Sequence, residues 1–289
     1  MREEPRQSTC LITGASSGIG REAALSLAAQ GLKVLLVCRN RDRGEAVLAE
    51  IEKLNGPGRA CLFIADLSSQ SEVRQLALDV QSQIGGLNII INNAGLVTSR
   101  RKITAEGMEM ILAVNHLAPF LLTRLLFKQL MPSARIINVT SSAHRAGRIN
   151  LADLHGEGHW NVYKAYAQSK LANVLFTYEL SRRLGNTGIT ANCVHPGIVA
   201  TRIFNNTPLL ARLIILPMTV LFVSPRKGAQ GLVNLALSNK LEGVTGAYFD
   251  RTCRSESSRR SYDSELAIKL WDQSERLTGI DAVASRDYI

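Results

Sequence analysis

The sequence is poor in aromatic residues and has no long uninterrupted apolar run. Aromatic side chains make up 5% of its 289 residues, and its Lys and Arg residues are spread along the chain rather than lined up on one helix. The formal net charge of +10 therefore indicates a solvated basic surface and argues against a nucleic-acid-binding protein. A phosphorylated cofactor or an acidic lipid surface would suit this charge.

The five cysteines are odd in number and include no C-x-x-C pair. Four of them stand in apolar runs, where cysteine acts as a small hydrophobe: Cys10, Cys38, Cys61 and Cys193. Residues 1–9 are polar and hold no apolar segment of the kind found in signal peptides. We therefore expect a reducing, cytoplasmic location, with no signal peptide or transmembrane anchor.

The histidines are not spaced like metal ligands. His155 and His159 lie in a glycine-rich loop, and no cysteine or carboxylate cluster completes a site around them. We expect that the protein holds no metal.

The most apolar stretch covers residues 209–223, and Arg212 and Pro217 interrupt it. It is shorter than the roughly 20 residues that a membrane-spanning helix needs. We expect it to cover an apolar pocket or to make peripheral contact with a membrane, and an ordinary core helix is the alternative.

Apolar strand-like runs alternate with helical patterns along the whole chain, and no linker divides it. This alternation predicts a single α/β domain, 1–289, of the doubly wound type, with a mostly parallel sheet between two layers of helices. We expect a segment at about 198–224 to cover the substrate and a helical tail at about 262–280. Expected strands are 8–13, 33–38, 60–64, 87–91, 135–139 and 189–194, with an edge strand at 247–249. The main expected helices are 21–30, 70–84, 107–131, 165–184, 224–237 and 264–277.

A glycine-rich turn joins the first strand to the first helix. Gly14, Gly18 and Gly20 follow the spacing G-x-x-x-G-x-G. Glycines let a backbone turn tightly and approach a pyrophosphate, and the helix N-terminus offers unpaired N–H groups to it. The motif predicts a dinucleotide site, and a plain strand-to-helix turn is the alternative.

The second strand ends on Arg39 and Asn40, 19 and 20 residues after Gly20. An NAD site would carry Asp or Glu there to bond the ribose 2′-hydroxyl. A guanidinium pairs instead with a 2′-phosphate. The sequence therefore predicts NADP(H), unless these residues only begin a polar helix.

Polar residues also follow the other strands. Asp66 could accept a hydrogen bond from an adenine amino group or cap the next helix. Asn93, Ala94 and Gly95 end the fourth strand, in the crevice where open α/β sheets bind ligands. In the predicted helix 107–131, Pro119 is expected to kink the chain and free a carbonyl near Asn115.

Tyr166 and Lys170 stand four residues apart in a predicted helix, so their side chains share one face. A phenol with its usual pKa near 10 is a poor acid or base at neutral pH. A cation one turn away lowers that pKa, which suits proton transfer to or from a carbonyl or alcohol oxygen.

Taken in order, these motifs closely resemble the short-chain dehydrogenase/reductase family from about Ser8 to Phe249. Several runs are similar to the retinol dehydrogenase branch and its WW-domain oxidoreductase relatives: 38–40, 115–123, 142–144, 169–176 and 194–197. Members of that branch usually carry an N-terminal membrane anchor. Residues 1–9 contain none, so we expect a soluble or peripheral protein.

The resemblance implies a role for each motif. Tyr166 would exchange the proton with the substrate oxygen, and Lys170 would also bond the nicotinamide ribose. Asn115 would hold a water near Lys170, and Ser141, chosen over Thr140 and Ser142 by alignment, would polarise the substrate oxygen. Cofactor contacts would come from Gly14, Ser16, Ser17, Gly18, Ile19, Gly20, Arg39, Asn40, Asp66, Leu67, Asn93, Ala94, Gly95, Tyr166, Lys170, Pro196, Gly197 and Thr201.

We therefore expect an NADPH-dependent enzyme that interconverts a lipophilic, retinal-like aldehyde or ketone and its alcohol. A broad reductase of steroid or xenobiotic carbonyls is the nearest alternative. A scaffold that senses NADP(H) without turnover is the alternative of another class, although it would not need the Asn115, Ser141, Tyr166 and Lys170 set. By analogy with the family, a homodimer could form through the helices that carry Asn115 and Tyr166.

Overall fold

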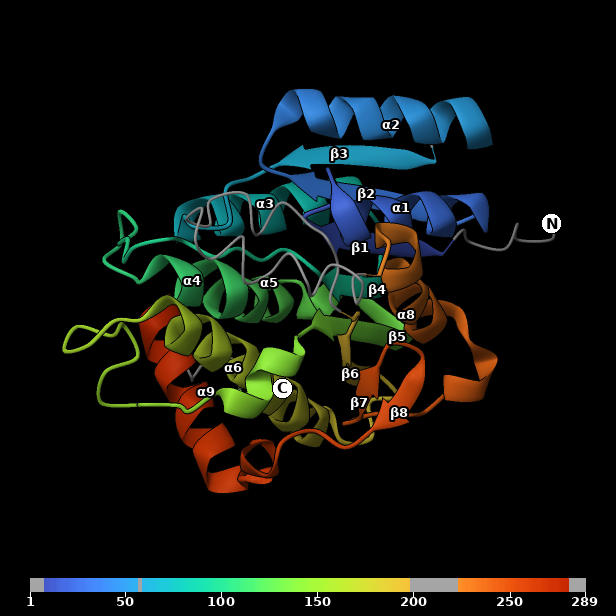
Figure 1. Ribbon diagram of the computed structural model, residues 1–289. Helices are drawn as coiled ribbons and strands as arrows, with labels where there is room; N and C mark the ends of the chain where they lie inside the picture. The colour runs from blue at the N-terminus through green and yellow to red at the C-terminus, as the bar shows by residue number, and fades with distance from the viewer. Residues whose placement is uncertain (1–7, 57–58, 198–222, 281–289) are drawn as a thin grey trace.

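A computed structural model describes residues 8–56, 59–197 and 223–280 of the chain. Its strands form one eight-stranded sheet with the order β3-β2-β1-β4-β5-β6-β7-β8 (Figure 1). All neighbouring strands are parallel except the β7–β8 pair. The strand bounds are β1 Thr9–Thr13, β2 Lys33–Cys38, β3 Ala60–Ile64, β4 Leu87–Asn92, β5 Leu130–Val139, β6 Thr190–His195, β7 Tyr248–Asp250 and β8 Cys253–Ser255.

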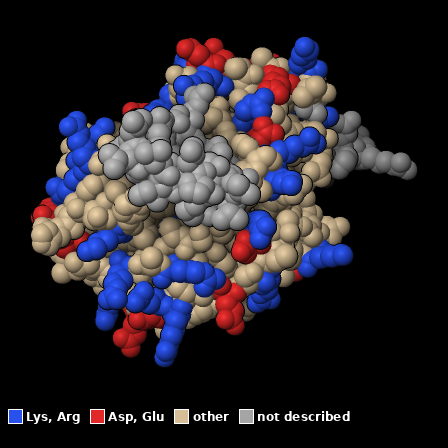
Figure 2. Space-filling view, in the orientation of Figure 1, with Lys and Arg blue, Asp and Glu red and all other residues tan. Residues whose placement is uncertain are grey.

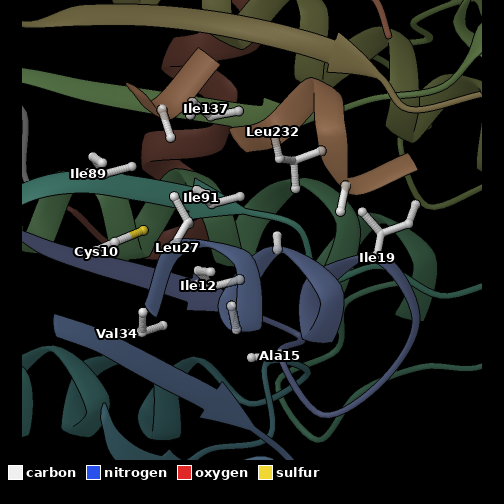
Figure 3. Packing of buried hydrophobic residues seen from close by; sticks show 14 of the residues in the cluster. Cys10, Ile12, Ala15, Ile19, Leu27, Val34, Ile89, Ile91, Ile137 and Leu232 are labelled. Atoms are coloured by element: carbon white, nitrogen blue, oxygen red, sulfur yellow. The ribbon is translucent and has the colours of Figure 1, made fainter. Parts of the chain in front are cut away.

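Helices cover both faces of this sheet, because neighbouring side chains of a strand point to opposite faces. In β1, Cys10 and Ile12 pack towards one layer of helices and Leu11 packs towards the other. The first layer comprises α1 Gly18–Ala29, α2 Arg41–Asn55 and α8 Pro225–Leu237. Figure 3 shows its core, where Leu27 of α1 and Leu232 of α8 meet Ile12 and Ile91 of the sheet.

The second layer comprises α3 Gln70–Gln83, α5 Ala118–Leu125 and α6 Val162–Leu184. Its core joins Leu11 and Phe63 of the sheet to Leu76 of α3 and Leu121 of α5. The arrangement is the predicted doubly wound α/β fold. Because β1 pairs with β2 on one side and β4 on the other, the chain reverses direction across the sheet beside β1, which is where open α/β sheets bind ligands.

The helix predicted at 107–131 is wrong at both ends. Gly107 turns with φ +80°, and Leu130 already begins β5. Between them the chain forms a short helix α4 Met110–Leu112, a π-helical turn η1 Ala113–Leu117, helix α5 and a 3₁₀ turn η2 Phe127–Gln129. Pro119 has no N–H that could donate to the carbonyl of Asn115. One residue earlier, the N–H of Ala118 donates to the carbonyl of Ala113, five residues before it, which is the π-helical spacing.

The strands predicted at 33–38 and 60–64 have those bounds in the structure, and, apart from 107–131, the other predicted elements shift by one to five residues at an end. The helix carrying Tyr166 begins at Val162, because the Asn161 side chain accepts hydrogen bonds from the N–H groups of Tyr163 and Lys164. The strand predicted at 247–249 as an edge is β7, which lies between β6 and β8, so its prediction as an edge was wrong.

The predicted C-terminal tail contains α9 Ser264–Thr278, which packs along α6 (Figure 1). Trp271 of α9 is buried, with its ring 5.0 Å from that of Phe120 and 5.8 Å from that of Phe176. Arg124 and Glu275 form a buried ion pair at 2.7 Å beside it. The tail is therefore part of the core.

Most of the segment predicted to cover the substrate, 198–224, lies outside the described residues, and only its residues 223 and 224 are among them. Thr201 also lies outside the described residues. The apolar run 209–223 lies outside them up to its last residue. Among the helices that are described, none combines the length and apolar character needed to cross a membrane.

We predict that Trp271→Ala lowers the free energy of unfolding by about 3–5 kcal/mol, because it leaves a cavity beside the rings of Phe120 and Phe176 and removes a partner of Glu275. Ile268→Ala on the same helix removes a side chain that is 44% exposed and is expected to cost about 0.5 kcal/mol or less. Urea unfolding of both variants tests this. Equal losses would contradict the core role of α9.

Candidate active site

The glycine-rich turn is closed by the loop that follows β4. Gly14 and Gly18 adopt φ +68° and +58°, which favours glycine. A Cβ on Gly20 would lie 2.4 Å from both the Asn93 side-chain nitrogen and the Gly14 carbonyl oxygen. Asn93 in turn donates to the Thr13 carbonyl at 2.8 Å. The close approach therefore requires glycine at position 20.

Thr13 is a site residue that the sequence did not single out. Its hydroxyl oxygen accepts the backbone N–H groups of Asn93 and Ala94, each at 3.0 Å. These bonds join the ends of β1 and β4, the two strands at which the chain reverses direction. The only signal in the sequence was the place of Thr13 directly before Gly14.

The N-terminus of α1 opens from this turn. Ser17 is the N-cap residue, but its side chain makes no capping hydrogen bond and is exposed. Ile19 is buried in the core below, and the Ser16 side chain hydrogen-bonds the Cys38 thiol. The first N–H groups of α1, Gly18 to Gly20, therefore suit an anion such as a pyrophosphate.

We predict that Gly20→Ala costs about 1–3 kcal/mol of stability, since the added methyl must displace Asn93 or the Gly14 backbone. Gly85→Ala is the matched control, because its added methyl would meet no group within 4 Å. Thermal unfolding compares the two. A loss for Gly85→Ala as large as that for Gly20→Ala would rule out crowding as the cause.

The end of β2 presents Arg39, whose side chain is 71% exposed and lies 4.0 Å from an Asp66 carboxylate oxygen. Asn40 caps α2 by accepting the N–H of Arg43 at 2.9 Å. Asp66 accepts the N–H and hydroxyl of Ser68, while Ser69 caps α3, so Asp66 is not the cap residue. The half-buried Leu67 packs against the core.

The Tyr166 and Lys170 side chains lie together on α6, as predicted. The Lys170 ammonium lies 5.7 Å from the centre of the Tyr166 ring. It is buried and donates a hydrogen bond to the carbonyl of Val139 at the end of β5, at 3.1 Å. The Tyr166 side chain is hydrogen-bonded to that of Ser141.

Burial determines the proton affinities of both groups. It lowers the pKa of Lys170 to about 8. It raises the pKa of Tyr166, and the hydrogen bond from Ser141 offsets this in part. The lowered phenol pKa expected from the Tyr–Lys spacing is therefore wrong for this structure, in which the ammonium faces the ring.

Three adjacent hydroxyl residues follow β5, and they have different surroundings. The buried Thr140 donates to the Lys170 carbonyl at 2.9 Å. Ser142 is exposed at the start of the 3₁₀ turn η3, Ser142–Ala146. Ser141, between them, is half-buried and accepts the N–H of Ala143 at 3.2 Å. Of the three, only Ser141 is paired with Tyr166.

The Asn115 side chain is hydrogen-bonded to the loop after β4. Its side-chain oxygen accepts the N–H of Leu96 at 2.8 Å, and its nitrogen donates to the Leu96 carbonyl and the Ser169 hydroxyl, each at 3.1 Å. Gly95 lies between Asn115 and Lys170, because an added Cβ would be 3.3 Å and 3.5 Å from their polar atoms. Asn115 therefore supports the loop, a role that the sequence did not predict.

The end of β6 completes this edge. Pro196 is buried, and Gly197 has φ +90° with Val223 so close that a Cβ would lie 2.6 Å from it. The structure thus brings the residues predicted after β1, β4, β5 and β6, together with Asn115, Tyr166 and Lys170, to the carboxyl end of the sheet. Arg39, Asn40, Asp66 and Leu67 lie farther along the same edge, after β2 and β3.

The fold and this edge agree with the relatives of the chain. The family model described as short chain dehydrogenase matches residues 8–209. The chain is 39% identical over 272 residues to retinol dehydrogenase 11 of Homo sapiens, covering 93% of this chain and 85% of the relative. The chain belongs to the short-chain dehydrogenase/reductase family, in its retinol dehydrogenase-like branch, and is an oxidoreductase whose fold binds a nicotinamide cofactor.

Solved structures are similar in the same way. An uncharacterised protein from Mycobacterium paratuberculosis has a TM-score of 0.77 at 33% identity, with 94% of each chain covered. A blue fluorescent protein from a metagenomic library, in complex with NADPH, has a TM-score of 0.68 at 28% identity, covering 84% of this chain and 95% of that one.

Proposed function

We propose that the protein uses NADP(H) to interconvert a lipophilic, retinal-like aldehyde or ketone and its alcohol. The observation that carries this is the hydrogen bond between the Tyr166 and Ser141 side chains, next to the buried Lys170 ammonium. This is the set of groups that a carbonyl needs: a proton donor, a second hydroxyl to polarise its oxygen, and a nearby positive charge.

The residues present fit a nicotinamide dinucleotide. At Gly14 and Gly20 the turn lies too close to its neighbours, Asn93 among them, to leave room for a Cβ. The N-terminus of α1 would hold the pyrophosphate. The bound cofactor supplies or accepts the hydride. Arg39 would hold the 2′-phosphate, because its side chain is exposed and its ion pair with Asp66 is long, at 4.0 Å.

The protein's own groups would manage the proton. In reduction, the Tyr166 hydroxyl donates its proton to the substrate oxygen, while the Ser141 hydroxyl donates a hydrogen bond to the same oxygen. The Lys170 ammonium stabilises the phenolate that remains, and oxidation reverses these steps. Because burial raises the pKa of Tyr166, the hydroxyl stays protonated at neutral pH and is ready to act as the acid.

The substrate class rests on the relatives. Retinol dehydrogenase 11 is so named for a lipophilic alcohol, and the apolar run 209–223 of this chain is the segment that we expect to line such a pocket or to contact a membrane. A broad reductase of steroid or xenobiotic carbonyls remains the second candidate, since Tyr166 and Ser141 would act on any carbonyl. A non-catalytic NADP(H) sensor would have no use for their pairing.

The face expected to form a homodimer lies along the helices that carry Asn115 and Tyr166. In this chain α9 packs against α6 and η1, with Trp271 between Phe120 and Phe176. A pair built on that face would have to displace α9.

Basic side chains are scattered over the face seen in Figure 2 rather than gathered in one stripe, which favours a solvated surface over a nucleic-acid site.

We predict that Tyr166→Phe lowers kcat by about 10²–10⁴-fold with NADPH and retinal, because the proton donor is lost. The Kd for NADPH, followed by nicotinamide fluorescence, should change little. Tyr163→Phe is the control, since Tyr163 stands on the same helix and is 73% exposed. If Tyr166→Phe keeps full turnover, another group transfers the proton.

The wild type itself tests the non-catalytic alternative. Tight NADPH binding without turnover of retinal, a medium-chain aldehyde or a steroid ketone would favour the NADP(H)-sensing scaffold.

We predict that Arg39→Asp weakens NADPH binding about 10- to 100-fold and shifts preference towards NADH, because a charge-assisted bond is replaced by repulsion. Lys53→Asp makes the same charge change in the last turn of α2, which begins beside Arg39, and controls for net charge. Titration of each variant with both cofactors gives the ratio. An unchanged ratio in Arg39→Asp would assign phosphate recognition to another residue.

A further inference from the structure

The loop that carries Ser141 is fastened to a segment more than 100 residues away. That segment, Glu256–Tyr262, follows β8 and includes the 3₁₀ turn η7 Arg259–Tyr262. Arg145 donates to the Glu256 carbonyl at 2.6 Å, and Arg260 donates to the Gly147 carbonyl at 3.4 Å. Between these two contacts, the backbone N–H of Ser258 donates to Nε2 of His144 at 3.0 Å.

His144 joins this segment to Ser141 itself. Its ring is fully buried, 5.0 Å from the ring of Tyr248, and its Nδ1 lies 2.7 Å from the Ser141 carbonyl oxygen. A carbonyl can only accept and a backbone N–H can only donate. Nδ1 must therefore carry the proton and Nε2 must be bare, so both partners together select one neutral tautomer. Burial also lowers the pKa of His144, which favours the neutral ring.

The same segment is bonded to the helix that carries Tyr166. The hydroxyl of Tyr178, on α6, lies 2.7 Å from that of Ser257, which lies 2.6 Å from that of Ser261. The rings of Tyr178 and Tyr262 are stacked at 5.5 Å. The segment Glu256–Tyr262 thus contacts the Ser141 loop on one side and α6 on the other.

We propose that His144 is a positioning residue, whose imidazole ties the Ser141 carbonyl to the segment Glu256–Tyr262 and so holds the Ser141 hydroxyl against Tyr166. This inference rests on the proposed function, because positioning Ser141 matters only if Ser141 acts on a substrate. His144 touches no reacting atom in this arrangement. It acts through the backbone of Ser141, whose side chain reaches Tyr166.

Two substitutions separate the hydrogen bond from packing, because Leu is close to His in volume but cannot donate, whereas the smaller Asn keeps a donor. His144→Asn keeps an amide N–H near the place of Nδ1 and can still donate to the Ser141 carbonyl, whereas His144→Leu cannot. We expect kcat to fall about 100-fold in His144→Leu and by 10-fold or less in His144→Asn, because a misplacement of about 1 Å can cost that much. The Kd for NADPH should stay within about twofold in both, and exposed His159→Leu should match the wild type.

A double-mutant cycle asks whether His144 acts through Ser141. In a Ser141→Ala background, His144→Leu should cause little further loss of kcat, since the hydroxyl that it positions is already gone. The same 100-fold loss in both backgrounds, or equal losses in His144→Leu and His144→Asn, would overturn the proposal.

A readout without turnover keeps the inference separate from the proposed function. In protein labelled with ¹⁵N-histidine, NMR of the wild type should show a buried imidazole protonated at Nδ1 and bare at Nε2, and its loss in His144→Asn should assign it to His144 rather than to buried His116 or His195. Protonation at Nε2 would refute the arrangement even in an active enzyme. If the wild type reduces no carbonyl but this signal is present, the proposed function fails and the link from His144 to the Ser141 backbone stands.

Discussion

The candidate active site depends on the burial of the Lys170 ammonium. A buried cation is costly unless it finds hydrogen-bond acceptors, and Lys170 finds one in the carbonyl of Val139, at the last residue of β5. The hydroxyl of Thr140, the residue directly after β5, donates a hydrogen bond to the Lys170 carbonyl. These reciprocal bonds fasten α6 to the end of β5 at one register, and that register decides which face of α6, and therefore which tyrosine, meets the hydroxyl residues that follow the strand.

The part of the candidate site formed by the loop after β4 depends on an irregular helix. A regular α-helix through Asn115 would leave its carbonyl facing Pro119, which has no N–H. The chain forms the π-helical turn Ala113–Leu117 there, and the fully buried Asn115 side chain lies against the backbone of Leu96. Both polar ends of the amide are used there, and they hold the loop after β4 so that a Cβ at Gly95 would lie 3.3 Å from the Asn115 side-chain oxygen and 3.5 Å from the Lys170 nitrogen. The irregular helix thus helps to position the loop after β4 in the candidate site.

Much of this arrangement is visible in the sequence. Apolar runs that end in Gly14, Asn93, Ser141 and Gly197 predict both the parallel sheet and the edge at which those residues meet, because the ends of parallel strands come together. The Tyr166–Lys170 spacing predicts their shared face. Local patterns mislead where the answer depends on tertiary partners: the apolar pattern of 107–131 continues through a turn, and β8 is a short, mostly exposed strand without an apolar signature.

The direction of the Tyr166 pKa could not be read from spacing either, because spacing carries no information about burial. A cation one turn away on a solvated helix would stabilise the phenolate. In the structure burial raises the pKa of Tyr166 and lowers that of Lys170. His144 is a similar case, because its partner Ser258 stands 114 residues further along the chain.

The residues proposed to react and some of the residues that support them lie in different parts of the chain. The family model matches residues 8–209, which contain Asn115, Ser141, Tyr166 and Lys170. Two further supports come from beyond that range: Ser258 bonds His144 behind Ser141, and Ser274 of α9 lies 2.9 Å from the ring of His116, the residue next to Asn115. Since two separate C-terminal elements reach the two walls of the site, loss of either would misplace one wall while leaving the residues of the other intact. The C-terminal part of this chain therefore supports the candidate active site from two sides.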